Sequence, residues 1–233
     1  MDRKYSLALH DLRISEGRNL LGIIEGLRNH FQIPLTIHLV FDEDFDTQPE
    51  LLMYLKNQAY AGNLEIVFHG LKHSCSKNVL RLWAFFHKYQ AEYLENDAGH
   101  REATRKCFAT IEDEMATKLG ICPPCWLASK ENNEFFQSLQ PLYIESLLSL
   151  RYQGKKVISP VISLGSSRRL EVFFLEILAD TICLISSILR LRRVRIAMHL
   201  CDLDIETSRL FFDNIISRFN GRGFKPVLLR ELN

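Results

Sequence analysis

The 233 residues are 47% hydrophobic, a share typical of globular proteins and too high for a disordered chain. Lys and Arg total 29 and Asp and Glu total 28, and the resulting net charge of +1 argues against a nucleic-acid-binding protein. The length suits one α/β barrel, so we expect residues 1–233 to form a single domain.

The sequence shows neither a signal peptide nor a membrane span. Its N-terminus has only a short apolar stretch before charged residues follow. The most apolar segment, residues 170–191, contains three acidic side chains, which suit a helix packed on a sheet better than a bilayer. We therefore expect a cytoplasmic protein that has free thiols and does not associate with membranes. The basic run 190–195 is interpreted as a solvated loop.

Strand and helix patterns alternate along the chain. Strands are expected over residues 5–9, 35–41, 64–68, 121–126, 142–145, 157–163, 194–200 and 224–229. Helices are expected over residues 16–31, 49–61, 77–119 with an interruption at 96–99, 130–139, 170–189 and 205–219. This alternation predicts an α/β fold with a parallel sheet, either open and doubly wound or closed into a barrel. No glycine-rich phosphate-binding turn follows the first strand, so nucleotide binding has no support.

Polar side chains collect at the C-terminal ends of the predicted strands. His10 and Asp11 end the first strand, His69 ends the third, and His199 ends the penultimate one. Active sites of parallel α/β proteins are built at this edge of the sheet. Several such residues together favour a functional site over a purely structural sheet.

The segment HGLKH, residues 69–73, places two histidines four residues apart. This spacing lets both imidazoles reach one ion, and Gly70 permits a sharp turn at the end of the strand. By itself the motif also fits two unrelated surface histidines. Asp11 adds a carboxylate, and two histidines with one carboxylate are a frequent ligand set for catalytic Zn²⁺.

Strand alternation predicts the direction of the other two histidines. His199 shares a face with Ala197 and Arg195, which indicates that it points into the fold, as a catalytic group or as a core histidine. In a regular strand His10 would point away from Asp11.

Six short motifs, in order, are similar to the polysaccharide deacetylase family (carbohydrate esterase family 4-like), and most closely to a branch carried as a domain of unknown function. They are LALHD at 7–11, EIVFHGLKH at 65–73, EY at 92–93, PPCWL at 123–127, SSRR at 166–169 and AMHLCD at 197–202.

The resemblance implies a distorted (β/α) barrel, often of seven strands, and metal-dependent removal of an acyl group, usually acetyl, from an N-acylated sugar. It implies that Asp11, His69 and His73 bind a divalent metal, most simply zinc. It implies that His199 protonates the leaving amine, and that Pro124 and Trp126 form one wall of the substrate groove.

The first motif departs from the family pattern. Better-known members have two adjacent aspartates there, the first being the base, and this chain has His10 in that place. The base is therefore either His10 or, as a substitute, Glu92. Asp202 is a candidate to orient His199. Arg168 suits either an anionic group of the substrate or a solvated loop.

Two cysteine arrangements allow other interpretations. Cys122 and Cys125 have the spacing of a redox pair, but the middle of the chain favours small buried residues instead. Cys201 near His199 allows a cysteine nucleophile. The main hypothesis is a deacetylase acting on a small molecule or oligosaccharide. The alternative is a non-catalytic barrel that binds a carbohydrate or a partner, and the oligomeric state stays open.

Overall fold

The computed structural model of the chain describes residues 2–13, 19–41, 49–74, 92–95, 97–163 and 192–233. The expected helix 170–189 and Arg168 lie outside these residues. In the part described, no helix is long and apolar enough to cross a membrane.

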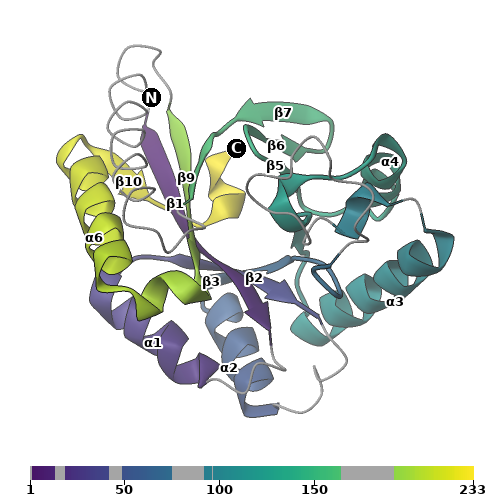
Figure 1. Ribbon diagram of the computed structural model, residues 1–233, viewed down its shortest axis with the longest axis horizontal. Helices are drawn as coiled ribbons and strands as arrows, with labels where there is room; N and C mark the ends of the chain where they lie inside the picture. Colours follow the sequence, from purple (N-terminus) through teal and green to yellow (C-terminus); the bar gives the residue numbers. More distant parts are fainter. Residues whose placement is uncertain (1, 14–18, 42–48, 75–91, 96, 164–191) are drawn as a thin grey trace.

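In the residues described, ten strands form one curled sheet in the order β7-β6-β5-β4-β3-β2-β1-β9-β8, and β10 pairs with β1 as a branch (Figure 1). Their bounds are β1 Arg3–Arg13, β2 Leu35–Val40, β3 Leu64–Phe68, β4 Gly120–Ile121, β5 Ile144–Ser146, β6 Ser149–Tyr152, β7 Lys155–Ile158, β8 Val161–Ser163, β9 Arg193–His199 and β10 Phe224–Pro226. All pairs are parallel except β5–β6 and β6–β7. The curled α/β sheet agrees with the expected distorted barrel, whereas the expected count of seven strands is not confirmed. The expectation that all strands are parallel is corrected by the antiparallel pairs β5–β6 and β6–β7.

The sheet curls into a half-barrel, as a distorted barrel requires. Its two flanks approach each other, because the Val161 amide donates to the Leu147 carbonyl at 3.2 Å and the Ser159 amide donates to Leu148 at 3.0 Å. This contact joins the region of β8 to the β5–β6 turn. The alternation allowed an open, doubly wound sheet or a barrel, and this curled half-barrel is closer to the barrel.

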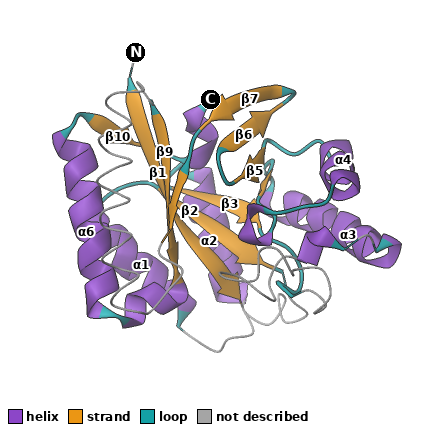
Figure 2. Ribbon diagram, turned by 45° about the horizontal axis from the view of Figure 1, so that its top comes forward, coloured by secondary structure: helices purple, strands orange, loops and turns teal. Residues whose placement is uncertain are grey.

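Helices cover the convex side of the sheet (Figure 2). They are α1 Leu20–Phe31, α2 Pro49–Tyr60, α3 Ala98–Met115, α4 Lys130–Ser138 and α6 Glu206–Gly221. The described residues also form short 3₁₀ helices elsewhere: η3 Glu92–Leu94, η4 Pro124–Trp126, η5 Leu200–Asp204 and η6 Leu229–Leu232. Side-chain caps fix three of the α-helix starts: Asn19 accepts from Gly22, Asp97 from Gly99 and Ser129 from Asn132.

The two faces of the central strands differ in polarity. Outward-facing residues such as Leu7, Ile37 and Ile196 are buried in the large apolar core. The inward row alternates with them and is mostly small or polar. It includes Ser6, Ala8 and His10 of β1, Thr36 and His38 of β2, Glu65 and Val67 of β3, and Arg195 and Ala197 of β9. A barrel interior of this polarity needs internal hydrogen-bond partners.

Of the basic run 190–195, the structure describes residues 192–195, and most of these do not form the solvated loop that was expected. Arg193 and Arg195 belong to β9, and Arg195 is only 2% exposed. It donates to Glu145 at 2.8 Å across the barrel interior. The interpretation failed because a buried carboxylate on a distant strand can hold an arginine inside a fold.

Candidate metal centre

The first strand is irregular where it reaches the site. The pairing of β1 with β2 shifts register between Leu9 and Leu12, and Asp11 has a positive φ of 61°. A bulge of this kind changes the direction of the side chains around it. His10 and Asp11 therefore line the same pocket, although a regular strand would send them to opposite faces.

A tight turn after β3 brings His73 back beside His69. Gly70 has a φ of +96°, and a Cβ placed on it would lie 2.1 Å from an oxygen of Glu92. The Glu92 carboxylate accepts the amide hydrogens of Leu71 at 2.9 Å, Lys72 at 2.8 Å and His73 at 2.6 Å. Buried backbone donors are thus satisfied by one buried carboxylate, which fixes the shape of the turn.

Asp11, His69 and His73 converge at one point. The Asp11 Oδ1 atom lies 3.0 Å from His69 Nε2 and 2.9 Å from His73 Nε2, and the two Nε2 atoms are 3.3 Å apart. Ligand atoms about 2.0–2.1 Å from a tetrahedral Zn²⁺ are about 3.3 Å from one another. The three donors therefore fit a divalent cation in both chemistry and spacing.

The surroundings prepare these donors for a cation. His69 Nδ1 donates to the Cys122 carbonyl at 2.7 Å, which leaves the lone pair on Nε2, the nitrogen that faces Asp11. Burial opposes ionisation of Asp11, but its contacts with His69 and His73 outweigh it and hold the pKa of Asp11 well below its ordinary value. The carboxylate is therefore charged at neutral pH.

His199 lines the same pocket as the three candidate ligands. Ligand atoms of His10, Asp11 and His199 all lie within 4.8 Å of one another. Asp202 accepts the His199 amide hydrogen at 2.8 Å and lies 3.5 Å from His199 Nδ1. Burial lowers the pKa of His199, but the contacts with Asp202 and Asp11 outweigh it and raise the pKa overall. This histidine is suited to carry a proton.

The Pro-Trp segment lies over the same pocket. Trp126 and Cys125 line it, and the Trp126 ring centroid is 5.1 Å from that of His10. Pro124 lies behind the pocket wall, and its ring packs against the backbone at Gly70. Cys122 is fully buried and burial raises its pKa, so its thiol is a core group of low reactivity. Cys201 is exposed and unbonded to another cysteine.

Among the described residues that were predicted for the site, Glu92, Pro124 and Asp202 do not line the pocket itself. Glu92 directs its carboxylate at the backbone of the 69–73 turn, with His100 at 3.7 Å on the other side. Arg168 is outside the described residues. Conversely, sequence reasoning missed His38 and Glu145, which lie beneath His10. The alternation Thr36-Ile37-His38 on a buried strand was the available signal for His38.

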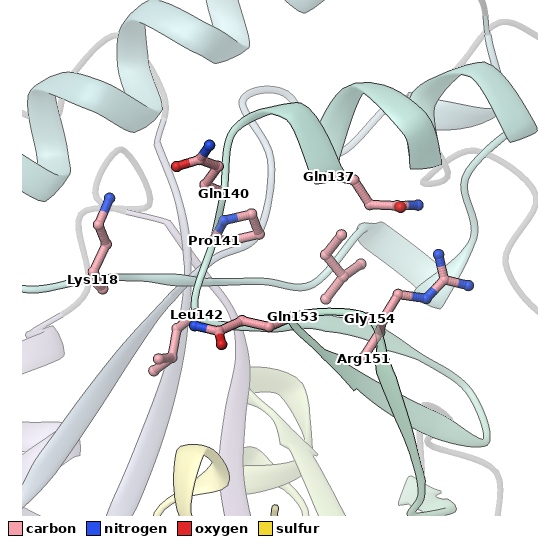
Figure 3. A pocket seen from close by; sticks show the side chains of 9 residues that line it. Lys118, Gln137, Gln140, Pro141, Leu142, Arg151, Gln153 and Gly154 are labelled. Atoms are coloured by element: carbon pink, nitrogen blue, oxygen red, sulfur yellow. The ribbon is translucent and has the colours of Figure 1, made fainter.

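A larger cavity, of about 570 Å³, opens at the opposite edge of the sheet (Figure 3). Lys118 and Leu142, which precede β4 and β5, form part of its wall together with Arg151 from β6. None of the predicted site residues lines it, and Lys118 is paired with Glu112 at 2.8 Å. The candidate site is therefore assigned by its donor set and not by its size.

Comparison with known proteins gives likeness in structure only. No family model and no curated protein sequence matches the chain. Among solved structures, the Puue allantoinase superposes with a TM-score of 0.62 at 13% identity, over 99% of this chain and 89% of that one.

Two deacetylating enzymes are also similar. The Bc1960 peptidoglycan N-acetylglucosamine deacetylase, in complex with a naphthyl N-oxidanyl-benzamide, gives a TM-score of 0.57 at 13% identity over 99% of this chain and 88% of that one. A family 4 acetyl xylan esterase from Clostridium thermocellum, in complex with a cobalt ion, gives 0.53 at 14% identity over 98% and 90%. At these identities the likeness establishes the fold, and the chain has the fold of the family 4 polysaccharide deacetylases that its motifs resemble.

Proposed function

We propose that this chain is a metal-dependent hydrolase that removes an acyl group, most simply acetyl, from an N-acylated sugar or a related small molecule. The observation that carries the proposal is the convergence of Asp11, His69 and His73, within 2.9–3.3 Å of one another, at the C-terminal edge of the sheet. The shared fold with deacetylases and an allantoinase supports the same class of chemistry, hydrolysis at an acyl carbon.

The three residues would hold one divalent cation, of which Zn²⁺ suits the two imidazoles and one carboxylate best. A cation held there supplies Lewis acidity toward the acyl carbonyl and lowers the pKa of water. The charged Asp11 attracts the cation, and the Cys122 carbonyl keeps the His69 ring turned toward it.

His199 is the group that would donate a proton to the leaving nitrogen. The contacts with Asp202 and Asp11 raise the pKa of His199, which favours the protonated imidazole that an acid needs, and Asp202 lies 3.5 Å from its Nδ1. Trp126 gives the pocket an aromatic wall of the kind that packs against a sugar ring.

The first test is metal binding. Wild-type protein, stripped and then titrated with Zn²⁺, should take up one equivalent, and His69→Ala should lose it. His30→Ala is the matched control, because His30 is exposed and pairs with Asp213 at 2.7 Å, away from the pocket. Failure of the wild type to hold zinc at micromolar free concentration would sink the proposal.

The second test separates catalysis from binding alone. We expect turnover of N-acetylated sugars, and we expect His199→Ala to reduce kcat for an amide by about 10²–10⁴-fold. An ester with a good leaving group needs no proton on that group, so the same variant should affect its hydrolysis much less. Zinc binding without turnover of either substrate type would instead identify a non-catalytic barrel that binds its ligand.

A further inference from the structure

A chain of buried polar side chains runs from the pocket into the barrel. His10 Nδ1 lies 2.8 Å from His38 Nδ1, and His38 Nε2 lies 2.8 Å from Glu145 Oε1. The other oxygen of Glu145 accepts from Arg195 Nη1 at 2.8 Å. All four side chains are buried, and His38 is 0% exposed. The chain thus connects a pocket residue to an ion pair on β5 and β9.

Arg195 is held from several sides. Its Nε donates to the Ser159 carbonyl at 2.9 Å, and its Nη2 donates to Ser159 at 2.6 Å, to Leu147 at 3.2 Å and to Ser146. This guanidinium already balances the charge of Glu145. A second positive charge on His38, in the same buried space as Arg195, would cost free energy without a carboxylate of its own.

The positions of the hydrogens follow from these contacts. A carboxylate has no hydrogen to give and repels a bare nitrogen; because Glu145 Oε1 lies 2.8 Å from His38 Nε2, a neutral His38 carries its hydrogen on Nε2. A neutral His38 then has a bare Nδ1. Because two Nδ1 atoms 2.8 Å apart need one hydrogen between them, it belongs to His10. His10 Nε2 is left without a hydrogen, as a base requires.

We infer that His38, beside Glu145 and Arg195, is a positioning residue that keeps Nε2 of His10 bare in the pocket that Asp11 and His199 also line, so that His10 accepts the proton of the attacking water. This inference rests on the proposed function and assigns the base that the substitution of His10 for aspartate left open. A ring nitrogen of His10 belongs to a group of ligand atoms, all within 4.8 Å of one another, with Asp11 and His199, and to a second such group with His38, His69 and Cys122. Among the described residues, no such group joins His10 to Asp11, His69 and His73 together. His10 therefore stands beside the three-ligand centre and is not its fourth ligand.

Removing the link should change the ring of His10 without removing the metal. In His38→Asn, the amide oxygen can replace Nδ1 as acceptor, whereas His38→Leu offers no acceptor at all. Long-range ¹H–¹⁵N spectra of zinc-saturated protein, assigned with His10→Gln, report which ring nitrogen is protonated. We expect a protonated Nδ1 on His10 in the wild type and in His38→Asn, and its loss in His38→Leu. Glu145→Gln serves as the second variant should His38→Leu fail to fold.

Steady-state kinetics of the same His38 variants test the inference independently of the spectra. His38→Leu should lower kcat about 10-fold or more with unchanged zinc affinity, and His38→Asn should restore most of it. In a His10→Ala background, His38→Leu should have no further effect, since it acts through His10. Wild-type His10 protonated on Nε2, or bonded to zinc, would overturn the inference, as would additive effects in the double variant. A wild type with the expected ring state but no turnover would refute the proposed function and leave the positioning intact.

Discussion

Asp11 has two separate requirements, one for its charge and one for its backbone. Its φ of 61° lies in the left-handed region, which Asn and Asp tolerate and β-branched residues avoid. Asp11→Asn should therefore keep the free energy of unfolding of the metal-free protein within about 1 kcal/mol. Its zinc affinity should fall by more than the roughly 10–100-fold typical of outer-shell changes. Asp11→Val should lose zinc and also about 1–2 kcal/mol of stability. Urea unfolding and zinc titration separate the two effects, and an equally stable Val variant would contradict the backbone argument.

At the scale of single residues, the sequence predicts which side chains could bind a metal better than it predicts where those side chains point. Asp11, His69 and His73 could be selected because carboxylates and imidazoles at strand ends are unusual, and the structure brings them within bonding reach of one another. The bulge at Asp11 has no local signal, since it is a property of how β1 pairs with β2. The contacts of Glu92 were also invisible, because its three donors come from residues about twenty positions earlier.

The turn between β3 and His73 is the element on which the centre depends most. Gly70→Ala should cost about 1–2 kcal/mol for the left-handed backbone, and about 1–3 kcal/mol more because the new Cβ meets Glu92. Gly62→Ala is the matched control: its φ is +74° and a Cβ there meets nothing within 4 Å. Chemical denaturation should show the larger loss at Gly70, together with weaker zinc binding only there. Equal losses would mean that the contact with Glu92 has no energetic weight.

Among the elements, long periodic segments were predictable and short ones were not. The strand 64–68 and the helix 130–139 were placed within one residue, because apolar spacing and flanking Gly or Ser mark their ends. The hairpin β6–β7 was missed. Its strands have four residues each, and its pairing is set by a Gln153-Gly154 turn whose residues both adopt positive φ. A pattern of this length does not distinguish a strand from a loop.

Across the whole molecule, the barrel interior is held by polar groups at both ends. At the end opposite the metal centre, the Glu65 carboxylate accepts from Tyr143 at 2.8 Å and from the Arg230 amide at 3.0 Å. The Leu229 amide donates to Thr36 at 3.3 Å, so the C-terminal 3₁₀ helix closes this end. Leu229 and Leu232 pack there in a small apolar cluster inside the sheet. The motif that holds the candidate ligand His69 at one end of β3 thus also contacts the C-terminal 3₁₀ helix, through Glu65, at the other.

Glu65 makes this closure sensitive to pH. Burial, opposed by the hydrogen bonds from Arg230 and Tyr143, raises the pKa of Glu65 from 4.5 to about 7. The folded chain therefore keeps a proton that the unfolded chain releases, and stability falls as pH rises through the window from 4.5 to 7. A shift of this size corresponds to roughly 3–3.5 kcal/mol of unfolding free energy. In Glu65→Gln the amide oxygen can serve Arg230 and the amide nitrogen can face the Tyr143 hydroxyl, so this loss should disappear. Urea unfolding of metal-free wild type and variant at pH 5 and pH 8 measures it. If the difference between the two proteins is the same at both pH values, Glu65 does not retain its proton in the folded state.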